Sequence, residues 1–256
     1  MPSYKIKQAV ILAAGLGTRL RPLTDTMPKP MLPIAGKPLL EHTIVLLRGQ
    51  GYKDFILNLH HFPEKITSYF GNGEKFGVRI RYSDETKILL DTAGALKKVQ
   101  PFLDEHFLFM YGDEFHQFNF QPVVDFHIRN DAMATLVLKR FDNPQNGEIV
   151  KIHPSTRRVV EWHARPHGID NFNADLFLNS GLYVLSKKIL KYIAHDCPVK
   201  LDKDVLPVAL REGYPLFGWP TEENILDIGT AEKYRFAEEL YAMRPILTVS
   251  FFKDIH

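Results

Sequence analysis

The sequence is poor in cysteine and has no excess of charge of either sign. A single cysteine, Cys197, occurs in 256 residues, which excludes an intramolecular disulfide and a cysteine cluster for zinc. The formal net charge of +2 gives no reason to expect a nucleic acid or an anionic membrane as a partner. No segment approaches the roughly 18 apolar residues that a spanning helix needs, and residues 1–7 lack the apolar stretch of a signal peptide. We therefore expect a cytoplasmic protein.

The most informative segment is a glycine-rich loop near the N-terminus. Residues 8–14 form an apolar run that is typical of a buried strand, and residues 15–19 (Gly-Leu-Gly-Thr-Arg) follow it directly. A buried strand that opens into such a loop is where α/β proteins commonly hold phosphates. Arg19, Arg21 and Lys29 supply positive charge in a stretch whose prolines forbid a long helix. The segment predicts a cradle for the phosphates of a nucleotide.

Two common phosphate-binding motifs do not fit this loop. A P-loop ends in Gly-Lys-Ser/Thr, whereas Thr18 and Arg19 follow Gly17 here. A dinucleotide fingerprint needs a third glycine where Leu20 stands, so a nicotinamide-dependent oxidoreductase is disfavoured. A tight turn that merely needs glycine explains the two glycines alone, but it does not explain Arg19 and Lys29 beside them.

Strands and helices alternate through the first half of the chain. The patterns predict strands over 8–14, 55–59, 78–82 and 107–111, and helices over 38–50, 63–70 and 92–99. This alternation favours a mostly parallel sheet in three layers with right-handed crossovers.

The second half is richer in strands. They are predicted over 135–138, 148–152, 159–162, 176–178 and 181–185, with helices over 186–193, 201–211 and 230–242. These strands predict a sheet extension or a lid built onto the first core. Because no linker, repeat or low-complexity tract interrupts the chain, we expect a single domain over 1–256 with two functional halves.

Several segments together resemble the sugar-1-phosphate nucleotidyltransferases. Leu12 through Thr24 and Pro28 through Pro33 match the signature loop of that family almost without gaps. Asp91–Leu96, the Gly-Asp pair ending at Asp113 and Leu226–Thr230 then follow in family order. The resemblance is closest to short members that look like mannose- or heptose-1-phosphate guanylyltransferases.

The resemblance implies a fold and a reaction. The fold is a Rossmann-like three-layer α/β/α core with a mixed, mostly parallel sheet and a sugar-binding β-rich extension. Residues 1–130 would mainly bind the nucleotide, and residues 131–256 mainly the sugar phosphate. The reaction transfers a nucleoside monophosphate from a nucleoside triphosphate to a sugar 1-phosphate and releases pyrophosphate. Because the sugar phosphate is the nucleophile, catalysis rests on alignment and charge neutralisation.

The resemblance also implies roles for individual residues. Arg19 would hold the β and γ phosphates, Lys29 would lie nearer the α-phosphorus, and Asp113 and Asp227 would bind Mg²⁺, so that Arg19, Lys29 and Asp113 are the catalytic residues. The nucleotide-binding residues implied are Leu12, Ala14, Gly15, Gly17, Thr18 and Gly94.

The segment that would grip the sugar departs from the family pattern. The family often has Glu-Lys-Pro where this chain has Ala164-Arg165-Pro166. Arg165 keeps the cation expected at the sugar phosphate, and Asn179 is the second residue implied there. The loss of a carboxylate at Ala164 means that sugar recognition is altered or moved, with His163, His167 and Asn179 as candidates.

The substrates and partners follow from the same resemblance. We expect a nucleoside triphosphate and a sugar 1-phosphate, with a lean to GTP and a mannose- or heptose-like sugar. UTP or dTTP, and a non-catalytic nucleotide-sugar sensor on the same fold, stay as alternatives. Phe251-Phe252 leaves a homo-oligomer open.

Overall fold

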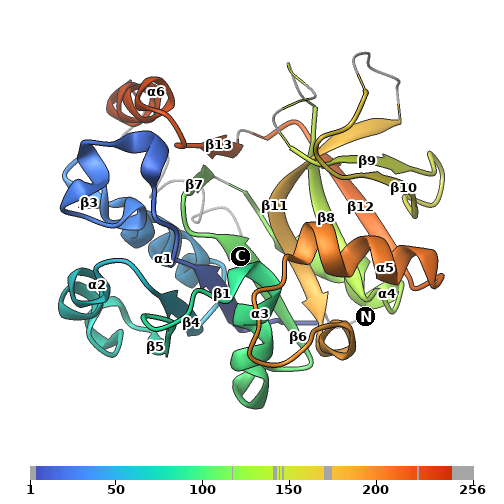
Figure 1. The fold of residues 1–256 in the computed structure, drawn as a ribbon, viewed down its shortest axis with the longest axis horizontal. Helices are drawn as coiled ribbons and strands as arrows, with labels where there is room; N and C mark the ends of the chain where they lie inside the picture. The colour runs from blue at the N-terminus through green and yellow to red at the C-terminus, as the bar shows by residue number, and fades with distance from the viewer. Residues whose placement is uncertain are drawn as a thin grey trace. The chain divides into compact units, whose positions relative to one another are not determined.

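The structure is a computed structural model that describes residues 4–116, 118–140, 143, 145, 147–169, 175–223 and 225–243. The described residues form two compact units, each assembled from separate stretches of the chain (Figure 1). The first unit draws on residues 1–10, 89–110 and 119–223. The second unit draws on residues 11–88, 111–118 and 224–256. The predicted single domain with halves at 1–130 and 131–256 stays a prediction.

The second unit has parallel strands, flanking helices and a small hydrophobic core of its own. Strands lie in the order β1-β4-β5, and β4 pairs in parallel with β5. The bounds are β1 Gln8–Leu12, β4 Asp54–Leu59, β5 Arg79–Asp84, α1 Leu39–Gly49, α2 Pro63–Phe70 and α6 Ala231–Met243. Leu20 and Leu32 of the N-terminal loop pack in one buried cluster with Tyr234 of α6. This packing fixes the glycine-rich loop against the C-terminal helix.

The first unit carries the strand-rich part of the chain. Its strands lie in the order β10-β9-β11-β6, and β8 pairs with both β11 and β12. Strand β11 runs antiparallel to β6, β8 and β9, whereas β12 runs parallel to β8. The bounds are β6 His106–Tyr111, β8 Ala134–Lys139, β9 Ile149–Ile152, β10 Val159–His163, β11 Leu176–Ser186, β12 Leu216–Thr221, α3 Asp91–Lys98, α4 Gln121–Arg129 and α5 Leu206–Arg211. Figure 1 shows β8, β11 and β12 as neighbouring strands of one sheet.

Most predicted elements are present, and the differences have local causes. Helix α4 and strand β12 were not predicted. The predicted helix over 201–211 is divided into a π-helical turn, Leu201–Val205, and α5, because Pro207 has no N–H to donate. The predicted helix over 186–193 is a run of 3₁₀ turns, Lys187–Tyr192. The two strands predicted over 176–185 are one continuous strand, β11.

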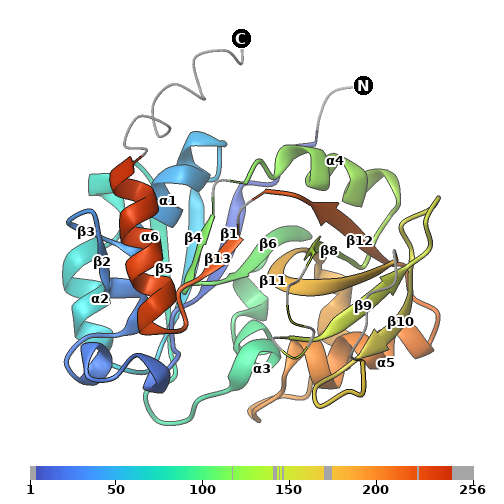
Figure 2. The ribbon, with the colours of Figure 1, turned by 90° about the horizontal axis from the view of Figure 1, so that it is seen from above.

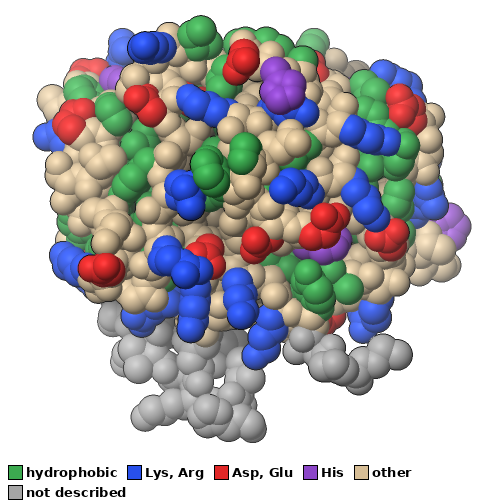
Figure 3. Space-filling view, turned by 90° about the horizontal axis from the view of Figure 1, so that it is seen from below, with side chains coloured by type: hydrophobic (Ala, Val, Ile, Leu, Met, Phe, Trp, Pro, Cys, Tyr) green, Lys and Arg blue, Asp and Glu red, His purple; other side chains and the backbone are tan. Residues whose placement is uncertain are grey.

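Surface features agree with the even charge balance. Lys and Arg side chains occur alongside Asp and Glu side chains on the face drawn in Figure 3. Among the described residues, no helix is long and apolar enough to cross a membrane. Phe251 and Phe252 lie outside the described residues.

Candidate active site

Two short strands of the second unit bring the predicted aspartates together. Strand β7, Glu114–His116, pairs antiparallel with β13, Ile225–Asp227, and the register sets Asp227 opposite Glu114. The backbone N–H of Ile228 donates to the carbonyl oxygen of Asp113 at 3.3 Å. Figure 2 shows that β13 leads directly into α6. The aspartate before β7 and the aspartate that ends β13 thus lie at one end of this ribbon.

Lys29 lies between the two carboxylates. Its Nζ is 2.5 Å from Oδ2 of Asp113 and 3.4 Å from Oδ1 of Asp227. The Lys29 side chain is only 7% exposed, whereas those of Asp113 and Asp227 are 33% and 30% exposed. A nearly buried ammonium needs such partners, because an unpaired buried charge is costly. The exposed carboxylate edges remain open to an ion or a ligand.

A second lysine, which the sequence did not suggest, also contacts Asp227. Lys233 lies in the first turn of α6, and its Nζ donates to Oδ2 of Asp227 at 3.3 Å. Burial acts to raise the pKa of Asp227, but Lys29 and Lys233 outweigh it and keep that pKa below its usual value. Asp227 is therefore ionised at neutral pH. The position of Lys233 near the start of the predicted helix over 230–242, a few residues after Asp227, could have indicated that it lies near this carboxylate.

The glycine-rich loop is held in a tight turn beside these charges. Gly17 has a φ of +63°, and a Cβ built on it would lie 2.9 Å from Cγ2 of Thr24. The hydroxyl of Thr24 donates to the carbonyl oxygen of Gly17 at 2.9 Å. Only glycine satisfies both the left-handed backbone and this close approach. Gly15 differs, because a Cβ built there meets no atom within 4 Å, so the space beside its backbone is open.

Arg19 lies next to the segment that carries Asp227. A Cβ built on Gly229 would lie 2.8 Å from Oδ1 of Asp227 and 3.2 Å from Nη2 of Arg19. Arg19 and Thr18 belong to a 3₁₀ turn, Thr18–Leu20, and both are exposed. The second unit therefore gathers Arg19, Lys29, Asp113 and Asp227.

The start of the loop is supported by two buried polar residues, Asn58 and Glu85, that no sequence motif indicated. The N–H of Ala13 donates to Oδ1 of Asn58 at 2.7 Å, and Nδ2 of Asn58 donates to Oε1 of Glu85 at 3.1 Å. Leu12 ends β1, and Ala14, which is buried, leads into Gly15. Glu85 directly follows β5, at the carboxyl end of a parallel strand, where α/β proteins bind ligands. The position of Glu85 shortly after a predicted strand could have indicated that it lies near a binding site.

Gly94 belongs to the first unit and has a packing role there. A Cβ built on Gly94 would lie 2.6 Å from the carbonyl oxygen of Cys197. The N–H groups of Ala93 and Gly94 both donate to the carbonyl oxygen of Val199, at 2.8 and 3.2 Å. The close approach of this chain segment is by itself a reason for glycine at this position.

Arg165 and Asn179, also in the first unit, share one neighbour. Nε of Arg165 donates to Oε1 of Glu148 at 3.3 Å, and the N–H of Asn179 donates to the backbone oxygen of Glu148 at 3.0 Å. The Asn179 side chain donates to the hydroxyl of Tyr183 at 2.6 Å. Glu148 lies in no motif, so the sequence did not suggest it.

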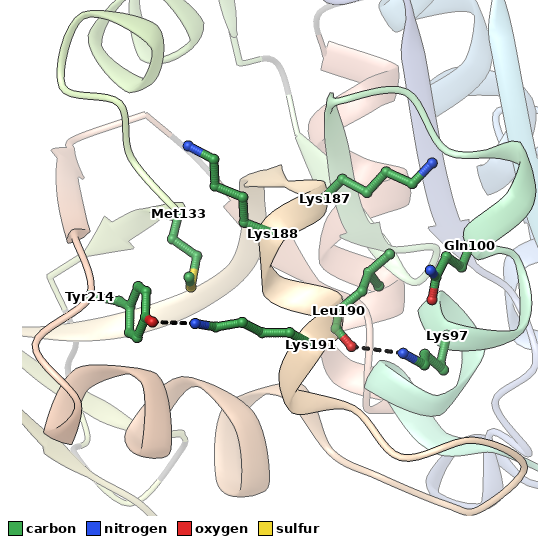
Figure 4. A pocket seen from close by; sticks show the side chains of 8 residues that line it. All are labelled: Lys97, Gln100, Met133, Lys187, Lys188, Leu190, Lys191 and Tyr214. Atoms are coloured by element: carbon green, nitrogen blue, oxygen red, sulfur yellow. Dashed lines mark hydrogen bonds between the residues drawn. The ribbon is translucent and has the colours of Figure 1, made fainter.

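A cavity of about 390 Å³ in the first unit contains none of the predicted site residues. Four lysines line it, but Figure 4 shows that their ammonium groups extend in different directions. Lys97 and Lys187 donate to backbone oxygens, Lys188 pairs with Asp131, and Lys191 donates to the Tyr214 hydroxyl. The cations do not converge on one point, so the cavity is not built as an anion site.

An α/β fold in which a glycine-rich loop, a lysine and two carboxylates gather in one unit is typical of proteins that handle phosphates. The chain belongs to the nucleotidyl transferase family, whose model matches residues 8–243. This match confirms the family that the sequence motifs indicated.

Two relatives match most of this chain. The chain is 32% identical over 239 residues to a UTP–glucose-1-phosphate uridylyltransferase of Synechocystis, covering 89% of this chain and 61% of that protein. It is 30% identical over 239 residues to a mannose-1-phosphate guanyltransferase of Yarrowia lipolytica, covering 91% of this chain and 64% of that protein. The chain thus spans about three fifths of the length of these relatives.

The fold is shared with solved structures. HddC from Yersinia pseudotuberculosis is 26% identical to this chain, with a TM-score of 0.77. The match covers 92% of this chain and 100% of the HddC chain. The same protein has been solved in a complex with GMP-PN. The expected fold class, a Rossmann-like α/β fold with a mixed, mostly parallel sheet, is confirmed.

Proposed function

We propose that this protein transfers a nucleoside monophosphate from a nucleoside triphosphate to a sugar 1-phosphate, giving a nucleoside-diphosphate sugar and pyrophosphate. The observation that carries the proposal is the position of Lys29, which contacts both Asp113 and Asp227 in the unit that also holds the glycine-rich loop. Family membership supports the same reaction class.

The loop and Arg19 would bind the triphosphate. The open space beside Gly15 allows a phosphate to approach the backbone N–H groups, together with those of Gly17 and Thr18. Arg19 is exposed and its planar guanidinium suits phosphate oxygens, so it would neutralise the charge that develops on the departing pyrophosphate. Lys29 would neutralise charge at the α-phosphate. None of these roles needs a protein nucleophile.

The two aspartates fit a magnesium ion. Their carboxylates lie within reach of one nitrogen, and each side chain is about one third exposed. No group of three or more metal-ligating side chains occurs among the described residues, so protein atoms alone would not complete a coordination shell. Mg²⁺ is commonly held by one or two carboxylates with water and substrate phosphates completing the shell. When bound, it would neutralise phosphate charge and polarise the reacting phosphoryl group.

Arg165 and Asn179 would bind the sugar phosphate. The Arg165 side chain is 45% exposed, so a phosphate can reach it. We further propose that the protein acts in the cytoplasm as one domain, 1–256, in which residues 1–130 mainly bind the nucleotide and residues 131–256 mainly bind the sugar phosphate.

The nucleotide preferred is GTP and the sugar mannose- or heptose-like. The similarity to mannose-1-phosphate guanyltransferase supports this choice. UTP is the second candidate, favoured by the similarity to UTP–glucose-1-phosphate uridylyltransferase. A non-catalytic sensor is less well supported, because Arg19, Lys29, Asp113 and Asp227 are all present.

The test is pyrophosphate release from GTP, UTP and dTTP, each with mannose, heptose or glucose 1-phosphate, in the presence of Mg²⁺. We expect turnover with at least one pair, loss of turnover in EDTA, and loss in Arg19→Ala and Lys29→Ala proteins that remain folded. Absence of pyrophosphate release from every pair would refute the proposal. Persistence of activity in EDTA would remove the metal role alone.

A further inference from the structure

Glu148 is a buried carboxylate that contacts both residues proposed for the sugar phosphate. Its side chain is 5% exposed and accepts from Nε of Arg165 at 3.3 Å, while its backbone oxygen accepts from Asn179 at 3.0 Å. It precedes β9 by one residue, on a segment outside every motif of the chain. A nearly buried carboxylate is costly unless it is paired, so Arg165 is the partner that permits Glu148 at this place.

We infer that Glu148 is the positioning residue that holds the guanidinium of Arg165 for the sugar phosphate. The inference rests on the proposed function. Arg165 has a second restraint, because Nζ of Lys203 donates to its carbonyl oxygen at 3.3 Å. Lys203 thus restrains the backbone of Arg165, and Glu148 restrains its side chain.

A second acidic side chain, that of Asp202, contacts Glu148. Asp202, in the π-helical turn, forms a side-chain hydrogen bond with Glu148. Burial, and then the charge of Glu148, raise the pKa of Asp202 to about 6. Asp202 therefore takes up a proton more readily than an ordinary aspartate, and its hydrogen bond gives the Glu148 side chain a second polar contact beside Arg165. A pair of acids that served only to pack would be less costly as apolar residues.

An unpaired polar atom near Glu148 points to a polar ligand in this region. Nε2 of His167 contacts the carbonyl oxygen of Gly147 at 3.1 Å, one residue before Glu148. Nδ1 of the same ring is buried and has no hydrogen-bond partner among the described residues. Buried polar atoms normally have partners, so this nitrogen fits a hydroxyl or phosphate oxygen of a bound substrate.

Glu148→Gln keeps the shape of the side chain and removes its charge. We expect KM for the sugar 1-phosphate to rise about tenfold, as for the loss of one charge-assisted hydrogen bond, with KM for the nucleotide and the melting temperature little changed. The matched control is Glu161→Gln on β10, because Glu161 is an acid 46% exposed that pairs with Lys151 and His163. The probe is the sugar 1-phosphate that the wild-type protein uses best.

A double-mutant cycle separates positioning from direct contact. If Glu148 acts through Arg165, Glu148→Gln will have little further effect in an Arg165→Ala background. Additive effects, or an unchanged KM for the sugar 1-phosphate in Glu148→Gln, would overturn the inference while leaving the proposed function intact. A wild-type protein that turns over no sugar 1-phosphate would instead overturn the proposed function, and the inference with it.

Discussion

Replacing Lys29 by methionine gives the most informative single perturbation of the site. The change removes a cation that is 7% exposed and leaves Asp113 and Asp227 facing one another without it. Exposed ion pairs contribute about 0–1 kcal/mol, and breaking a fully buried pair costs about 3–5 kcal/mol. Because both carboxylates are about one third exposed, an intermediate value applies, and we expect Lys29→Met to lose about 2 kcal/mol of unfolding free energy.

The same variant should bind Mg²⁺ more tightly. In the wild-type protein a metal ion must compete with the Lys29 ammonium for the same two carboxylates, and this competition is absent in Lys29→Met. If most of the ~2 kcal/mol is recovered on metal binding, the affinity for Mg²⁺ rises about tenfold, and saturating Mg²⁺ restores the lost stability. Isothermal titration calorimetry and thermal unfolding with and without Mg²⁺ measure both quantities without any turnover.

Two control variants test whether the effect depends on contact with the two aspartates. Lys233→Met removes a cation that contacts Asp227 and is 44% exposed, so its effect should be smaller. Lys37→Met removes a cation that is 60% exposed and pairs with Glu41, and it should leave Mg²⁺ affinity unchanged. Equal or weaker Mg²⁺ binding in Lys29→Met would show that the lysine and the metal do not share these carboxylates.

Two further predictions concern the loop and a buried histidine. Gly17→Ala should lower the unfolding free energy by about 1–2 kcal/mol because of its left-handed φ and the 2.9 Å approach to Thr24, whereas Gly15→Ala should leave stability unchanged and weaken nucleotide binding. Urea unfolding and nucleotide titration test this pair, and equal destabilisation by both changes would contradict it. His127 contacts His106 at 3.1 Å and Thr135 at 3.0 Å, and burial, followed by the charge of His106, lowers its pKa to about 3. Its stabilising contribution is therefore present above the unfolded pKa of about 6.5 and is lost at about 1.4 kcal/mol per pH unit as the pH falls toward 3. Unfolding measured between about pH 6.5 and 5 should show a shallower slope in His127→Asn than in the wild type, and parallel slopes would contradict the assignment.

The elements that were predicted are those with a strong periodic pattern. Helix α1 and strand β4 have apolar residues at helical or continuous spacing, and their bounds agree closely with the prediction. Strand β12 was missed because its sequence, Leu-Phe-Gly-Trp-Pro-Thr, contains a glycine and a proline that are typical of loops. It forms a strand because β8 offers it a parallel partner, which no local pattern records.

The residues of the candidate site that the sequence suggested are those that belong to a motif. Lys29, Asp113 and Asp227 come from separate motifs, and their contacts follow from the β7–β13 pairing rather than from any local signal. Glu148 and Asn58 act by supporting other residues, and a supporting side chain is defined by its neighbours in space. Such residues have no sequence signature of their own.

Attack at the α-phosphorus defines the proposed reaction, and the fate of a labelled phosphate distinguishes it from other phosphoryl transfers. The purified protein is incubated with Mg²⁺, a sugar 1-phosphate and a nucleoside triphosphate labelled at the α-phosphate, and the products are separated. We expect the label to enter a nucleoside-diphosphate sugar and the pyrophosphate, formed in equal amount, to be unlabelled. Label retained in a nucleoside diphosphate, or no labelled product with any nucleotide and sugar pair, would contradict it.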